Sequence, residues 1–100
     1  MSISVNQVHG QVAAAIKALE KLPAKEREAK PSRLFAENYN TLLALSKELM
    51  PDVDERRWPP EAPLHTPAMG QQTSELRFTE IHSFLEQMLA ILGEGYEYVL

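Results

Sequence analysis

The stretch TSELRFTEIHSFLEQMLAIL, residues 73–92, is the most apolar segment of the chain and the most clearly helical. Its apolar side chains recur at gaps of three and four residues, which is the spacing of one helix face. They are Leu76, Phe78, Ile81, Phe84, Leu85, Met88, Leu89, Ile91 and Leu92. At about 100° per residue, all but Leu76 fall on an arc of roughly 160°. Because one neighbouring helix cannot cover so wide an arc, we predict at least two. We expect Thr73 or Ser74 to cap this helix, and Gly93 to follow it.

Two earlier segments show the same periodicity. The first begins with a capping box in which Ser4 is the N-cap and Gln7 lies three residues on, and we expect it to end near Pro23. The second is predicted over about Arg33–Met50, with apolar residues around roughly half of its circumference. Ser46 falls inside that apolar face, so we expect its hydroxyl to bond to a carbonyl one turn earlier.

The connections between these helices are polar or rich in proline. Residues 23–31 have no apolar face, and we interpret them as a solvated connection with room for one helical turn. Asp52 begins a second capping-box pattern, which predicts a short helix through about Trp58. Residues 59–72 contain four prolines and no periodicity, so we expect a long loop there.

The chain is therefore predicted to be all-α, with residues 1–100 forming a single helical domain. The expected fold is an antiparallel three-helix bundle with an additional short helix and a long proline-rich loop. The second and third long helices have wider apolar faces than a three-helix monomer needs. We therefore predict a homodimer through those two helices.

Charge and composition exclude several classes of function. The net charge is −4, and residues 61–100 carry one Lys or Arg against six Asp or Glu, so we expect no nucleic-acid binding. No run approaches the ~18 apolar residues of a membrane span, and the first ten residues lack the features of a signal peptide. The chain has no cysteine, which fits a reducing compartment. We expect a cytoplasmic protein that binds no membrane.

Candidate chemistry is sparse. His82 and Glu86 lie four residues apart and could meet on a helix surface, but a zinc site needs at least three protein ligands. No serine-nucleophile, phosphate-loop or metalloprotease motif is present. We therefore expect no metal, no cofactor and no enzymatic activity.

The candidate interaction residues follow the second long helix. Trp, Arg and a stiff proline segment are typical of interface anchors. They occur together as Arg56, Arg57, Trp58, Pro59 and Pro60. With Pro63, this run also matches the Arg-x-x-Pro-x-x-Pro spacing of polyproline ligands. The alternative interpretation is that Trp58 folds back and covers one end of the bundle, because a tryptophan buries much apolar area.

The C-terminal residues 96–100 offer a second candidate. Tyr96 and Tyr98 belong to an apolar and aromatic end, which we expect to be docked on protein rather than free in water.

Two functions remain open from the sequence. The first is a non-enzymatic protein–protein interaction or regulatory module with an unidentified protein partner. The alternative is a small-ligand-binding or catalytic bundle with a pocket between the second and third long helices. That pocket would lie near Asn38, Tyr39, Arg77 and His82. Convergent polar groups in a pocket would favour the alternative, and a filled core would favour the interaction module.

Overall fold

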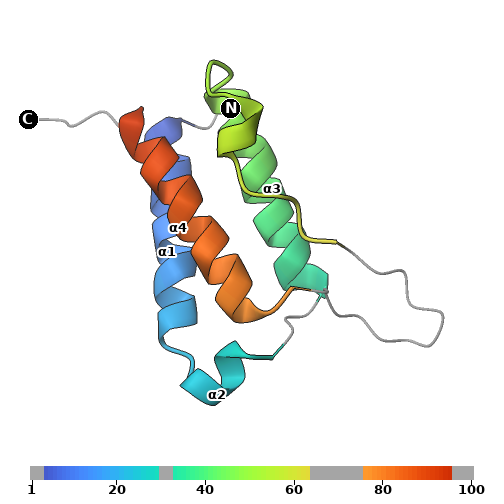
Figure 1. Ribbon diagram of the computed structural model, residues 1–100. Coiled ribbons are helices and arrows are strands. Elements are labelled where there is room, and N and C mark those ends of the chain that lie inside the picture. Colours follow the sequence, from blue (N-terminus) through green and yellow to red (C-terminus); the bar gives the residue numbers. More distant parts are fainter. Residues whose placement is uncertain (1–3, 30–32, 64–75, 96–100) are drawn as a thin grey trace, which may run out of the picture.

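A computed structural model describes residues 4–29, 33–63 and 76–95 of the chain (Figure 1). Three long helices are packed together, which confirms the predicted all-α helical bundle. They are α1 (Val5–Glu20), α3 (Arg33–Leu49) and α4 (Phe78–Glu94). A four-residue helix, α2 (Ala24–Arg27), lies in the predicted polar connection, and a short 3₁₀ helix, η1 (Glu55–Arg57), follows α3.

Helix α1 begins as its sequence predicts. The Ser4 hydroxyl accepts a hydrogen bond from the Gln7 backbone N–H at 3.2 Å, and the Gln7 side chain accepts one from the Ser4 N–H at 2.8 Å. This reciprocal pair satisfies two backbone donors that the first turn would otherwise leave without partners. The helix buries Val8, Val12 and Ile16 on one face.

Helices α3 and α4 run parallel, and α1 runs antiparallel to both (Figure 1). Phe35 and Phe78, which lie near the N-terminal ends of α3 and α4, meet edge to face with ring centroids 5.2 Å apart. One turn further along α3, the Tyr39 ring lies beside the Phe84 ring of α4, with centroids 6.3 Å apart. Two of the three helices in such a bundle must run in the same direction. Here the parallel pair is α3 and α4, because the long connection between them returns the chain to the other end of the bundle.

The core lies between the three long helices, and α4 contributes most to it. Helix α4 contacts α1, α3 and α2, as its wide apolar arc predicts. The buried apolar residues are Val8, Val12, Ile16, Leu19, Ala36, Tyr39, Leu43, Trp58, Ala62, Ile81, Leu85, Met88, Ile91 and Leu92. Ser46 is fully buried, and its hydroxyl donates to the Leu42 carbonyl at 2.8 Å, which confirms the predicted bond to the preceding turn.

The ends of α4 differ from the prediction. The helix begins at Phe78 with Arg77 as its N-cap, and the predicted caps Thr73 and Ser74 lie outside the described residues. The Glu80 carboxylate accepts a hydrogen bond from the Arg77 backbone N–H at 3.1 Å. Glu80 therefore caps the start of the helix from the third helical position. Gly93 was predicted to follow the helix but lies within it, and Gly95 is the C-cap.

The start of α4 is held by the connection that precedes α3. The Phe78 N–H donates to the Ala29 carbonyl at 3.1 Å, and the Thr79 hydroxyl donates to the Arg27 carbonyl at 2.8 Å. Two backbone carbonyls of the polar segment 23–29 therefore fix the first turn of α4 in place.

Candidate functional site

Residues 54–63, which we call the strap, leave the end of α3 and cross to α4. Asp54 caps η1 by accepting from the Arg56 N–H at 2.9 Å, so Asp54 has the capping role predicted for Asp52. Arg57 forms a bidentate ion pair with Glu94 in the last turn of α4. The nearby guanidinium holds the pKa of the Glu94 carboxyl below its usual range. The Gln87 side chain donates to the Arg57 carbonyl at 2.6 Å.

The second half of the strap runs back along α3 and is held there by two side chains of that helix (Figure 1). The Tyr39 hydroxyl donates to the Pro60 carbonyl at 2.8 Å. The Asn40 amide donates to the Ala62 carbonyl at 3.0 Å and accepts from the Ala62 N–H at 2.8 Å. One side-chain amide thus binds both polar groups of a residue as a neighbouring backbone would.

Trp58 is 7% exposed and belongs to the core. Its backbone angles of −80° and 145° are those of polyproline II. The interpretation in which Trp58 folds back onto the bundle therefore agrees with the structure, although the strap follows the side of α3 instead of covering only one end. Pro59 is also buried, so neither side chain is available to a partner in this conformation.

The polyproline motif is divided between the surface and the core. Arg57, Pro60 and Pro63 are exposed, whereas Pro59 and Ala62 face inward, as three residues per turn require. The Pro60 and Ala62 carbonyls already accept bonds from α3. A partner that reads this motif would have to displace α3 first.

The remaining interaction residues stay predictions. Arg56 and Arg57 are exposed, and Arg56 pairs with Asp54. Tyr96 and Tyr98 lie outside the described residues.

The predicted pocket between α3 and α4 is only partly present. Asn38 and Tyr39 line a cavity of about 140 Å³, but Arg77 and His82 do not. Its other lining residues are Ala15, Phe35, Leu42 and Leu85. The lining is apolar except for the Asn38 amide and a Tyr39 hydroxyl that is already bonded to the strap. The cavity therefore lacks the convergent polar groups that would favour a ligand or catalytic site.

His82 lies away from that cavity and has an acidic neighbour. Its Nε2 atom is 3.3 Å from a Glu86 carboxylate oxygen, one turn along α4. Within the described residues, no group of three or more His, Asp or Glu side chains could hold a metal ion.

The seam between α1 and α3 is bordered by side chains that the bundle covers incompletely, and all of them except Asn38 are apolar. We call these side chains the open face: Leu34, Phe35, Asn38, Leu42, Leu45 and Leu49 of α3, with Ala15 of α1. Leu34 is 66% exposed, and the other leucines are half-buried. On a helical projection the α3 members span about 100° beside the buried stripe. The 140 Å³ cavity opens along this seam between Ala15 and Leu42.

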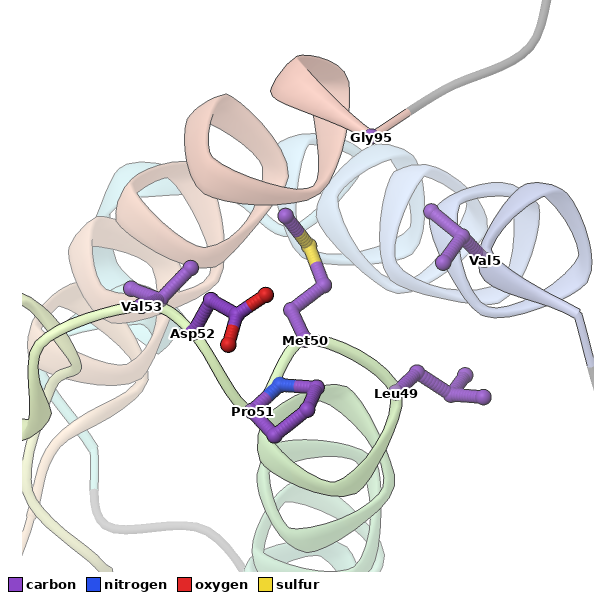
Figure 2. Close-up of a pocket in the computed structure, with 7 residues that line it drawn as sticks. All are labelled: Val5, Leu49, Met50, Pro51, Asp52, Val53 and Gly95. Carbon is purple, nitrogen blue, oxygen red and sulfur yellow. The ribbon is translucent and has the colours of Figure 1, made fainter.

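A second hollow, of about 300 Å³, lies at one end of the open face (Figure 2). It is lined by Val5, Leu49, Met50, Pro51, Asp52, Val53 and Gly95. Figure 2 shows the Met50 side chain reaching toward Gly95. A Cβ atom at Gly95 would lie 3.2 Å from the Met50 terminal methyl, so glycine permits this close approach. Leu49 belongs to both surfaces and makes the apolar region continuous.

Sequence reasoning identified the wide apolar arc of α3 but missed Asn40. Asn40 lies outside that arc, and its partner Ala62 is 22 residues away, so no local pattern indicates its role. The exposed position of Leu34 was also not anticipated. The width of the apolar arc of α3 was the one feature of the sequence that could have indicated an exposed leucine there.

Comparison of the chain with protein-family models, with curated proteins and with solved structures finds no match. Among the described residues, no helix is both long enough and apolar enough to span a membrane.

The buried Tyr39 hydroxyl predicts a dependence of stability on alkaline pH. Burial, and to a smaller extent the charge of Glu61, raises the pKa of Tyr39 above its ordinary value near 10. The folded chain then holds this proton more strongly than the unfolded chain. We expect full stability below about pH 10 and a fall above it, by at most about 1.4 kcal/mol per pH unit from this group.

The Tyr39→Phe variant isolates this effect. At pH 8 we expect it to be about 1 kcal/mol less stable, because the Pro60 carbonyl loses its donor. In urea denaturation between pH 8 and 11.5, the gap between the two proteins should narrow above pH 10. A constant gap would show that Tyr39 does not ionise on unfolding.

Proposed function

We propose that this chain is a small, non-enzymatic protein-interaction module that binds through its open face. The observation that carries the proposal is the row of partly buried leucines on α3, which ends at the exposed Leu34 and lies beside an apolar cavity. Exposed contiguous apolar surface is costly in water and marks interaction sites in soluble proteins. Leu42 and Leu45 lie at the centre of this row, one turn apart.

The open face fits a protein better than a nucleic acid or a metabolite. It contains no Lys or Arg that could neutralise phosphates, and Asn38 is its single polar member. Glu37, Lys47 and Glu48 of α3 lie on other sides of the helix. A ligand-binding or catalytic bundle receives less support, because the Tyr39 hydroxyl is occupied by the strap. The cytoplasm remains the proposed compartment, in keeping with the lack of cysteine.

The absence of cysteine permits a direct test. A single Leu45→Cys variant carries a photo-crosslinker on the open face, and Ala44→Cys carries it on an exposed side of the same helix, about 100° away. Both labelled proteins are irradiated, pure and in extract of the cells that make them, and the adducts are identified by mass spectrometry.

We expect one dominant protein adduct from position 45, whether with another copy or with a different protein, and none from position 44. Equal adducts from both positions, or none from either, would refute the proposed docking surface.

A further inference from the structure

We propose that the occupant of the open face is a second copy of this chain, so that α1 and α3 of two copies form a four-helix interface. This inference rests on the proposed function and names its partner. It also moves the predicted dimer contact from α3 and α4 to α3 and α1. The wide arc of α4 is used within the chain, where α1, α2 and α3 contact it.

The size of the face favours a second copy over a single docked helix. Helix α3 has 17 residues, which at 1.5 Å per residue makes it about 25 Å long. Two adjacent helices present a width of about 20 Å, so α1 and α3 together offer on the order of 500 Å² of projected area. The accessible area of a corrugated surface is larger than its projected area, and a standard interface buries roughly 800 Å² per partner. A lone helix in the seam would cover about half as much.

The face is also complementary to itself. Leu42 and Leu45 lie one turn apart on α3, and Leu42 also lines the 140 Å³ cavity together with Ala15 and Leu85. In a two-fold symmetric pair the same patch occurs on both sides, so the leucines of each copy can pack against the cavity of the other. Because the face bears no formal charge, no like charges meet there. Asn38 is exposed, and two copies could pair their amides across the axis.

The end hollow extends the contact. Leu49 links this row to Val5 and Met50 of the end hollow, which Asp52 also lines (Figure 2). The apolar residues of the open face thus run from Leu34 to Leu49 along α3. A partner as long as α3 would cover both hollows at once.

The test measures molar mass by size-exclusion chromatography with light scattering from about 1 to 200 µM, with helix content checked by circular dichroism. The wild-type chain is expected to reach twice the 11.3 kDa of one copy.

Leu45→Glu should weaken dimerisation more than about 100-fold, because it would bury an unpaired carboxylate in the interface. Ala44→Glu makes a similar change of charge on an exposed side of the same helix and should leave the dimer intact. If Leu45→Glu fails to fold, Asn38→Lys replaces it in the test, because Asn38 is an exposed position of the open face. It should also weaken the dimer.

Each outcome decides the inference. A dimer that is lost in Leu45→Glu or Asn38→Lys and kept in Ala44→Glu supports it. A dimer that all variants keep would place the contact elsewhere and overturn it. A wild-type monomer at every concentration also overturns it. If position 45 then still crosslinks to a different protein, the proposed function stands without the second copy. If it crosslinks to nothing, both fail.

Discussion

Replacing Trp58 with alanine is expected to lower the free energy of unfolding by about 3–5 kcal/mol. Trp58 is 7% exposed and holds the strap between α3 and α4, so its removal leaves a large cavity. Domains of this size have total stabilities of about 5–15 kcal/mol, and the loss would be a large part of that. The measurement is urea denaturation followed by circular dichroism at 222 nm, because the variant has no tryptophan to report fluorescence.

Arg56→Ala provides the neighbouring control. The Arg56 side chain is 90% exposed, and its ion pair with Asp54 lies at the surface, where such pairs contribute little to stability. If Trp58→Ala cost no more than this control, Trp58 would have to be a surface residue in solution. Its role as an interface anchor would then return as the better interpretation.

The three helices could be predicted because burial is periodic along each of them. Val8, Val12 and Leu85 are buried at the positions that a spacing of three and four residues requires. The start of α1 was also predictable, because a capping box involves residues only three apart. Where several polar residues could cap a helix, as before α4, the choice depends on tertiary contacts. Phe78 is held by Ala29, which lies 49 residues earlier and has no sequence signature.

The position of the strap could not be predicted for the same reason. Arg57 pairs with Glu94 and Asn40 with Ala62, at separations of 37 and 22 residues. The proline spacing indicated a polyproline conformation but not which of its sides faces the core. The open face was half predictable. The sequence indicated that the apolar arc of α3 is wider than one neighbouring helix can cover. It did not indicate that the uncovered part of the arc adjoins α1.

Replacing Asn40 with alanine is expected to cost about 2–3 kcal/mol and to loosen the strap before the bundle unfolds. The side chain satisfies both the N–H and the carbonyl of Ala62, which is 3% exposed, and an unsatisfied buried polar group costs about 1–3 kcal/mol. Trp58 is the only tryptophan of the chain, so its fluorescence reports on the strap, while circular dichroism reports on the helices. In the variant, emission should shift to longer wavelength at urea concentrations where the helix signal is still native.

Glu48→Gln is the control, since Glu48 also belongs to α3, is exposed and lies outside the open face. We expect it to change stability by less than about 0.5 kcal/mol, with both signals changing together. If Asn40→Ala behaved in the same way, the strap would be held by Trp58 burial alone. If the two signals separate only in Asn40→Ala, the strap is a distinct unit whose release would expose the Arg57–Pro63 motif. The proline-rich segment would then have a conformation in which a partner could read it, which the folded bundle does not offer.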